Sequence, residues 1–405
     1  MEKRDYGKNE KQMNMIQFHS GWKLLYLKLK YALSVLKYLT RRKKYSLFFF
    51  KSLKLLGKGK FLRITKIPKF GKYYYPAVLR VPRWPSRSFD RMVAGGGLNF
   101  EAYGTPLNRQ IDSVVLAITR KCKYNCQHCY EHHNLAEEDT VPIERWKTAI
   151  KTLQQSGVSS FILSGGEPML RFEGLLEIVG SVDTDLSDFH VHTSGYGVTP
   201  EKAAILKKYG ITAAGIAFDD FNPGEHDRVR GYSGAHQNAV QAIHYFREAG
   251  IFPYINLCIR KDLARPGALW KYFDYVNGLN AGAISMLEPK PCGKYISGNG
   301  GDLLSKEERE GVTTFFNEAN LGKKYRNYPP VIYFQYYERP DINGCLMGAL
   351  SHFYINSLGN VQPCIFLPTS FGNIMEEELP VILKRMREAV PKPIKQPCPA
   401  VTRCL

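Results

Sequence analysis

Three cysteines fall within eight residues near the start of the central part of the chain. Cys122, Cys126 and Cys129 have the spacing CxxxCxxC and follow a short apolar run. Three thiolates in so short a loop can bind three irons of one cubane and leave the fourth iron for another ligand. A zinc site is the alternative, with His128 or His132 as the fourth ligand. The spacing predicts a metal site and favours an iron–sulfur cluster.

A glycine-rich turn follows the next apolar run along the chain. Phe161–Ser164 leads directly into Gly165, Gly166, Glu167 and Pro168. Two glycines let the backbone approach a ligand closely, and a buried carboxylate can receive an ammonium group. Alone, this sequence is compatible with a simple tight turn. Together with the cysteine loop one strand earlier, it predicts a binding site for a small ligand beside the metal.

Apolar, β-branched runs alternate with helical stretches from residue 111 onward. Pro142 and Gly157 bound one predicted helix, Ile143–Gln155, and another is expected between Pro200 and Gly210. Six strand–helix units indicate a parallel sheet but are too few for a closed eight-fold barrel. We therefore expect an α/β fold, a partial (β/α)6 TIM-like barrel with its site at the strand carboxyl ends. The runs are Val114–Thr119, Phe161–Ser164, Phe189–Thr193, Ala213–Phe218, Pro253–Ile259 and Ala283–Leu287.

A second group of cysteines lies near the carboxyl end, where the alternation has stopped. A hairpin turning at Leu358-Gly359 and a helix from about Glu376 to Ala389 are expected in the same region. Four cysteines are enough for one further cluster, although free cysteines are also common in apolar cores. Cys258 and Cys292 lie apart from both groups and fit the core interpretation. The members of the second group are Cys345, Cys364, Cys398 and Cys404.

Positive charge is concentrated in the first hundred residues. They hold 24 Lys or Arg and four acids, a net charge of +20, whereas the whole 405-residue chain carries +19. Such a segment favours an anionic partner: membrane lipid, nucleic acid or an acidic peptide. No apolar secretion signal opens the chain, and nine cysteines without one argue for a reducing cytosol.

Residues 21–44 have the pattern of an amphipathic helix. Lysines interrupt every apolar run, so this helix cannot span a bilayer. It can lie in a membrane interface, with Leu47–Phe50 as a second contact, or it can pack on the protein body with its lysines in solvent. Residues 61–89 predict a short hairpin and an extended connector. The apolar side of the helix consists of Leu24, Leu25, Leu29, Ala32, Val35, Leu36 and Leu39.

The cysteine loop after one strand and the GGEP turn after the next resemble the radical S-adenosylmethionine (SAM) superfamily over about residues 111–290. The resemblance implies a [4Fe-4S] cluster on Cys122, Cys126 and Cys129, with SAM bound to the fourth iron. It also implies that the turn binds the methionine amino group of SAM. The residues that it places around SAM are Gly165, Gly166, Glu167, Pro168, His128, Ser194, Arg230 and Asn256.

Two of these assignments depend on segments with their own signatures. Ala217–Asp220, followed by His226–Gly231, is similar to the "SLDG…HDxxRG" pattern of the peptide-maturing and sulfatase-maturing branch, which implies that Arg230 contacts the SAM carboxylate. The serine of that pattern is Ala217 here, so its contact with the ribose is in doubt. Asn256 is the weaker candidate, since it can also cap a turn, and Arg230 can instead pair with Asp227.

The tail resembles the auxiliary-cluster region called SPASM, or its shorter relative Twitch. Gly359–Cys364 and Phe371–Ile374 carry this resemblance, and four cysteines imply one auxiliary [4Fe-4S] cluster. Sulfatase-maturing relatives have an aspartate where this chain has Ile365, so sulfatase maturation is not expected. We expect three parts: a basic helical extension at 1–100, the radical SAM core at 101–300, and a small α+β auxiliary-cluster domain at 301–405.

The resemblance implies an enzyme that reductively cleaves SAM and abstracts hydrogen from a substrate C–H bond. A peptide or protein substrate is expected, and a lipid or membrane-held substrate is the alternative. A flavodoxin or ferredoxin is the expected electron donor, an anionic membrane surface is a further partner, and no nucleic acid is expected. The expected location is the cytoplasm, with peripheral contact to the inner membrane surface as an option.

Overall fold

The computed structural model describes residues 15–40, 66–76, 81–94, 110–296, 303–396 and 398–402. For residues 31, 32 and 34–40 it describes the backbone alone. Cys404 and the run Leu47–Phe50 lie outside the described residues, as do the side chains of Ala32, Val35, Leu36 and Leu39. The predictions made for these residues therefore remain predictions.

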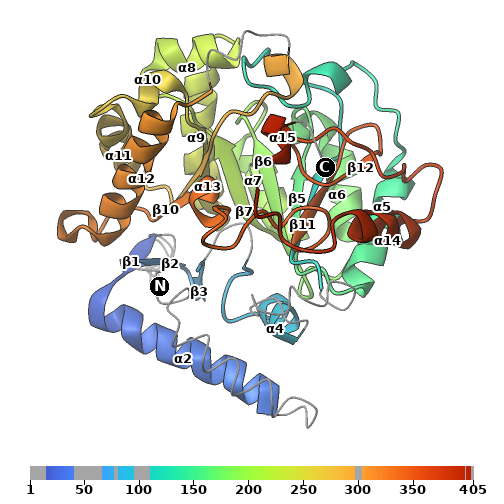
Figure 1. Cartoon of the computed structure of the whole chain (residues 1–405), viewed down its shortest axis with the longest axis horizontal. Helices are drawn as coiled ribbons and strands as arrows, with labels where there is room; N and C mark the ends of the chain where they lie inside the picture. The colour runs from blue at the N-terminus through green and yellow to red at the C-terminus, as the bar shows by residue number, and fades with distance from the viewer. Residues whose placement is uncertain are drawn as a thin grey trace, which may run out of the picture.

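Six parallel strands form the centre of the molecule in sequence order (Figure 1). They belong to a nine-stranded sheet in which β4 pairs with β5, β5 with β6, and so on to β9. Each strand lies within two residues of its predicted bounds, because continuous apolar runs are typical of strands buried on both faces. The strands are β4 (Ser113–Ala117), β5 (Ser160–Ser164), β6 (Asp188–Thr193), β7 (Ile211–Ala217), β8 (Phe252–Cys258) and β9 (Ile284–Leu287).

Helices connect these strands and bury one apolar face each against the sheet. Trp146, Phe246 and Phe273, each from a different helix, are fully buried together with sheet residues Phe161 and Phe189. The predicted helix boundaries hold because their signals are local: Pro142 precedes α5, and Gly210 ends α7 with a φ of 103°. The connecting helices are α5 (Ile143–Gln155), α6 (Phe172–Gly180), α7 (Pro200–Tyr209), α8 (Pro223–Arg230), α9 (Ala235–Glu248), α10 (Lys261–Ala264) and α11 (Ala268–Gly278).

The tail extends the same sheet at both edges. β10 (Val331–Tyr333) pairs in parallel with β9, and β11 (His352–Ile355) pairs in parallel with β4. β12 (Val361–Gln362) then turns back antiparallel to β11, as the predicted hairpin requires. The tail is therefore joined to the barrel through backbone hydrogen bonds. Its helices are α12 (Lys306–Leu321), α13 (Phe334–Tyr337), α14 (Leu379–Ala389) and α15 (Pro399–Thr402).

The N-terminal segment packs across the end of the barrel where the strands begin (Figure 1). Tyr75 stacks on Phe252, the first residue of β8, with ring centroids 3.9 Å apart. Asp188, the first residue of β6, accepts hydrogen bonds from the Arg83 backbone N–H at 2.8 Å and the Ser88 hydroxyl at 2.8 Å. The extension comprises β1 (Gln17–His19), α2 (Gly21–Thr40), β2 (Ile67–Phe70), β3 (Tyr73–Tyr74) and α4 (Arg87–Ala94).

Two features of this extension differ from the sequence-based expectation. β1 pairs with β2, so the predicted hairpin is part of a three-stranded sheet. The connector is extended only as far as Ser86, because the hydroxyl of Ser86 accepts a hydrogen bond from the Phe89 N–H and begins α4. Both differences follow from contacts that hydrophobic periodicity does not reveal.

The helix α2 presents apolar side chains on two opposite faces. Leu24 and Leu27 are buried, so one face packs on the protein. The other face exposes an apolar stripe at helical spacing, which consists of Trp22, Leu25, Tyr26, Leu29 and Leu33. Among the described residues, no helix is both long enough and apolar enough to cross a membrane.

Candidate functional site

A cavity of ≈ 310 Å³ lies at the ends of the barrel strands where the strands finish. Its wall includes Ser164, Thr193, Ala217, Cys258 and Leu287, which are the last residues of five consecutive strands. All eight cysteines in the described part of the chain also line it. The two cysteine groups found in the sequence therefore face one common space.

The cysteine loop follows β4 and is packed by aromatic rings. Cys126 is buried, and Cys122 and Cys129 pack against the same small cluster as Tyr124. The ring of Tyr124 stacks on Tyr232 with centroids 4.5 Å apart. Burial raises the pKa of the Cys122 thiol to about 12, so without metal this thiol is protonated at neutral pH. Cluster binding must therefore displace protons from the loop.

The described residues contain no group of three or more His, Cys, Asp or Glu side chains that converge on one metal-ion position. A cubane makes a different demand, because each thiolate binds a separate iron atom. The three sulfurs need only surround a common space, and this loop places them around the cavity.

The glycines of the GGEP turn allow close packing against the start of the cysteine loop. Gly166 N–H donates to the Thr119 carbonyl at 2.8 Å, and Glu167 N–H donates to the Lys121 carbonyl at 2.7 Å. A Cβ on Gly166 would lie 2.3 Å from the Lys121 oxygen, and Gly165 has a φ of 141°. Any side chain at either position would push the turn away from the cysteine loop.

Glu167 uses its carboxylate to hold the turn to the end of β6. One oxygen accepts hydrogen bonds from Met169 N–H at 3.2 Å and the Thr193 hydroxyl at 2.7 Å. The other accepts from Ser194 N–H at 2.8 Å and from the Ser194 hydroxyl at 2.5 Å. Burial raises the pKa of Glu167, while these hydrogen bonds oppose that rise. The carboxylate is fully occupied by the chain's own donors, and Gly165, Gly166 and Ser194 line the cavity beside it.

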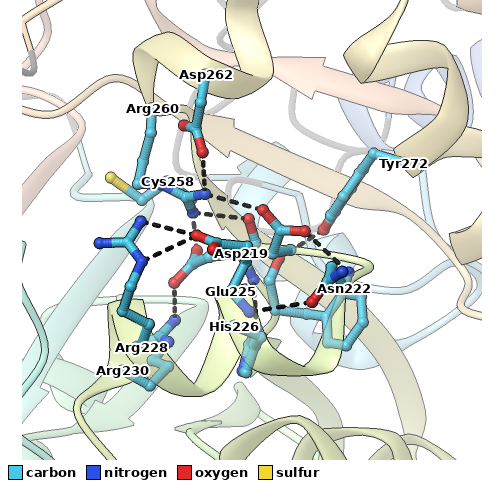
Figure 2. Close-up of polar contacts among 12 residues, drawn as sticks. Asp219, Asn222, Glu225, His226, Arg228, Arg230, Cys258, Arg260, Asp262 and Tyr272 are labelled. Carbon is cyan, nitrogen blue, oxygen red and sulfur yellow. Dashed lines mark hydrogen bonds and ion pairs between the residues drawn. The ribbon is translucent and has the colours of Figure 1, made fainter.

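Asp219 is the centre of a buried polar network that connects α8, through Arg230, to β8, through Cys258 (Figure 2). Arg230 Nη2 lies 2.7 Å from Asp219 Oδ2, and His128 Nε2 lies 3.3 Å from the same oxygen. The other carboxylate oxygen accepts the Cys258 N–H at 2.9 Å. Burial opposes ionisation of Asp219, but the positive charge of Arg230 and the contact with His128 bring its pKa to about 2.

Arg230 connects this network to the cysteine loop. Its Nη1 lies 3.6 Å from Cys126 Sγ, and the side chain is buried on the cavity wall. Arg230 pairs with Asp219 and not with Asp227, which caps the start of α9 through the N–H groups of Gly234 and His236. The sequence analysis quoted Asp219 within a motif but assigned it no role. Its place two residues after the end of β7 was the available signal.

His128 and Asn256 also line the cavity. The Asn256 Oδ1 atom is buried, and no donor among the described residues bonds to it. A buried carbonyl oxygen on a cavity wall is suited to receive a hydroxyl or amino group of a ligand. Pro168 begins the short helix Pro168–Arg171 behind the turn and is not part of the wall.

The tail brings three of its cysteines to the opposite side of the cavity. The Cys345 N–H and carbonyl exchange hydrogen bonds with Ile394, at 2.9 and 3.0 Å, which brings the Cys398 segment close. Gly348 N–H donates to the Pro363 carbonyl beside Cys364 at 3.1 Å. Burial raises the pKa of Cys364 to about 12, and the proximity of Cys398 adds to the rise. Cys258 and Cys292, expected in the core, also reach this cavity.

Glu131 joins the cysteine loop to the tail. Its buried carboxylate accepts hydrogen bonds from the Tyr354 hydroxyl of β11 at 2.6 Å and the Ser357 hydroxyl at 2.6 Å. The sequence analysis did not single out this residue, because nothing local indicates that β11 lies beside β4. These two hydrogen bonds connect the cysteine loop directly to the tail.

The donor set fits the implied cofactors. Thiols, a buried arginine beside one of them and a side-chain-free turn surround one space, as a cluster with an amino-acid-like ligand requires. A reduced [4Fe-4S] cluster supplies the electron that cleaves SAM in this superfamily. The chain's own contribution is to position the ligands, to bury them and to neutralise their charge.

Comparisons with known proteins agree with this geometry. Residues 116–260 match the model of the radical SAM superfamily, and residues 345–404 match that of an iron-sulfur cluster-binding domain, SPASM. An AdoMet-dependent heme synthase of Nitratidesulfovibrio vulgaris is 26% identical over 292 residues, which cover 67% of this chain and 78% of the relative. The subtilosin biosynthesis protein AlbA of Bacillus subtilis is 26% identical over 272 residues, which cover 65% of this chain and 57% of AlbA.

A solved structure shares the fold. SuiB of Streptococcus suis, bound to its precursor peptide SuiA, superposes with a TM-score of 0.54 at 16% identity, covering 73% of this chain and 69% of SuiB. The radical SAM domain brings a [4Fe-4S] cluster and SAM, and the SPASM domain brings auxiliary iron–sulfur binding. The chain is an enzyme of the radical SAM superfamily with a C-terminal SPASM domain.

Proposed function

We propose that this enzyme abstracts hydrogen from a C–H bond of a peptide or protein and so modifies it. The observation that carries the proposal is the single cavity shared by the cysteine loop, the GGEP turn and the tail cysteines. A substrate in that cavity contacts SAM on one side and the auxiliary site on the other. The names of AlbA and of the SuiB–SuiA complex support a peptide substrate.

Roles follow for the residues around the cavity. Cys122, Cys126 and Cys129 hold the SAM-binding cluster, while Cys345, Cys364, Cys398 and Cys404 hold an auxiliary one. Gly165, Gly166 and Ser194 face the methionine part of SAM, and Glu167 and Pro168 fix the turn behind them. Arg230 receives the SAM carboxylate, and His128 and Asn256 contact the rest of the molecule. A flavodoxin or ferredoxin supplies the electron.

A tetrapyrrole is the second candidate substrate, because the AdoMet-dependent heme synthase covers 67% of this chain. A lipid substrate, by contrast, loses support from the geometry. The exposed stripe of α2 belongs to the segment that covers the beginnings of the strands, and the cavity lies at their other ends. A membrane contact through that stripe leaves the cavity away from the bilayer.

The test follows the transferred hydrogen atom. Reconstituted enzyme is incubated anaerobically with SAM, dithionite and perdeuterated candidate precursor peptides, or with perdeuterated coproporphyrin. Mass spectrometry then measures deuterium in 5′-deoxyadenosine. Deuterium from a peptide is the expected result, and Cys126→Ala should form no 5′-deoxyadenosine. Deuterium from the porphyrin alone supports the second candidate, and 5′-deoxyadenosine formation by Cys126→Ala at the wild-type rate overturns the cluster assignment.

A further inference from the structure

A buried lysine lines the cavity in the loop that follows β9. Lys290 is only 6% exposed and lies on the cavity wall. In the described part of the chain its ammonium group makes one contact, with Glu288 Oε2 at the long distance of 3.4 Å. An ammonium group has three hydrogens to donate, so Lys290 has unused donor capacity inside the protein.

Glu288 does not serve this charge alone, because two closer partners share its carboxylate. Arg309 Nε lies 2.9 Å from Glu288 Oε2, and the Tyr333 hydroxyl donates to Glu288 Oε1. Burial alone would raise the pKa of Glu288, but Lys290 and these two donors hold it below its ordinary value. One carboxylate thus faces two cations, of which Arg309 is partly exposed to solvent and Lys290 is buried.

The other cation on the wall is already neutralised. Arg230, on the cofactor side, forms its short ion pair with Asp219. Two further acids line the cavity. The charge of Glu338 acts on Cys345 and Cys364, and the carboxylate of Glu131 accepts hydrogen bonds from Tyr354 and Ser357. A buried cation without full compensation is unfavourable unless an anion joins it.

We infer that Lys290 forms a subsite for a carboxylate of the substrate. This inference rests on the proposed function, because it places the carboxylate within the cavity that holds the reacting C–H bond. An acidic side chain or a chain terminus of a peptide supplies this group, and so does a propionate of a tetrapyrrole. Ion pairing with Lys290, together with Arg309 behind Glu288, orients the substrate across the cavity.

The experiment compares matched probes on reconstituted holoenzyme. One arm measures binding of coproporphyrin III against its tetramethyl ester, and the other compares the peptide Ac-Ala-Ala-Glu-Ala-Ala-NH2 with its glutamine counterpart. The variants are Lys290→Met, Lys290→Arg and the control Lys271→Met, which removes an exposed lysine of α11. Fluorescence quenching or calorimetry gives each Kd.

Wild type should prefer the carboxylate form about ten-fold in at least one arm, which identifies the source of the carboxylate. Lys290→Met should abolish that preference, Lys290→Arg should keep part of it, and Lys271→Met should keep all of it. Equal binding of the paired probes, no binding of any probe, or a preference retained in Lys290→Met would overturn the subsite. The wild-type comparison does not depend on the folding of any variant. Formation of 5′-deoxyadenosine by the same wild-type preparation reports separately on the proposed function.

Discussion

At the scale of single residues, buried charges hold side chains in place beside the cysteine loop. Asp219 is fully buried and holds Arg230 at 2.7 Å and His128 at 3.3 Å, so one carboxylate fixes both side chains. Arg230 in turn reaches Cys126. A charge change at Asp219 should therefore affect the cysteine loop although no cysteine is replaced.

Asp219→Asn should destabilise the protein and weaken its hold on the cluster. The amide can still accept the Cys258 N–H, but it leaves Arg230 buried without its counter-charge, which costs about 3–5 kcal/mol for a fully buried pair. Urea unfolding of the apoprotein and iron content after reconstitution measure the two effects. The control is Asp262→Asn, whose carboxylate is partly exposed and pairs with Arg260; it should lose no more than about 1 kcal/mol.

Iron content tests the two cysteine groups separately. Two cubanes give about eight irons per chain, so removing Cys122, Cys126 and Cys129 together should leave about half of the iron. Cys258→Ala is the matched control, because Cys258 lines the same cavity but belongs to neither proposed ligand set. A triple variant without any iron would show that the tail binds no cluster.

Sequence patterns predicted the cysteines and the GGEP turn because both are contiguous and each residue type has a specific chemical role. They did not predict that Glu167 binds Thr193 and Ser194, or that Glu131 binds Tyr354. These pairs join residues that are distant in the chain. No local periodicity specifies which buried carboxylate meets which hydroxyl.

At the scale of elements, the carboxyl ends of the barrel strands determine the position of the cavity. Apolar runs predicted the six barrel strands to within two residues, and local cap signals predicted the helices α5 and α7. The pairing of β11 with β4 was not predicted, because an apolar run does not indicate which strand it will pair with. That pairing brings Glu131 to Ser357 and encloses the cavity between the core and the tail.

Buried histidines in these elements should make stability depend on pH. Burial lowers the pKa of His190 in β6 to about 3, and burial together with Arg230 lowers that of His226 in α8 to about 3. The unfolded chain binds these protons near pH 6.5. The contribution of the two neutral histidines to the free energy of unfolding is therefore complete above that pH and is lost as the pH falls below it. For each of these histidines, the free energy of unfolding should fall by about 1.4 kcal/mol for every pH unit below 6.5.

Urea unfolding of the apoprotein between pH 7.5 and 5.0 measures this dependence. His226→Gln should shift the whole curve but flatten its slope in that range. His244→Gln is the control, because His244 is exposed on α9 and should leave the slope unchanged. An identical slope in wild type and His226→Gln would contradict the assignment of a buried neutral histidine.

At the scale of the whole molecule, the basic extension and the cavity occupy opposite ends of the barrel. Phe70 and Tyr75 pack on Phe252 at the start of β8, whereas Cys258 at its end lines the cavity. The helix α2 packs on the protein through Leu24 and Leu27, and it also exposes a second apolar stripe, so contact with a membrane stays a prediction. Its lysines flank that stripe, as at a membrane interface.

We therefore expect α2 to bind anionic membranes with the cavity facing away from the lipid. Each basic residue near the surface contributes about 1 kcal/mol, and the apolar stripe adds about 25 cal/mol per Å² that it buries. Cosedimentation with phosphatidylglycerol vesicles should weaken as salt rises, because screening removes the first contribution but not the second.

Leu29→Glu combined with Leu33→Glu should reduce binding by more than ten-fold. Ile205→Glu, which changes an exposed apolar residue of α7, should leave it intact. Vesicle-bound enzyme should still form 5′-deoxyadenosine at the rate of free enzyme. If vesicles do not bind at low salt, the exposed stripe serves another contact; if they bind but stop the reaction, the cavity faces the membrane and a lipid substrate regains its place.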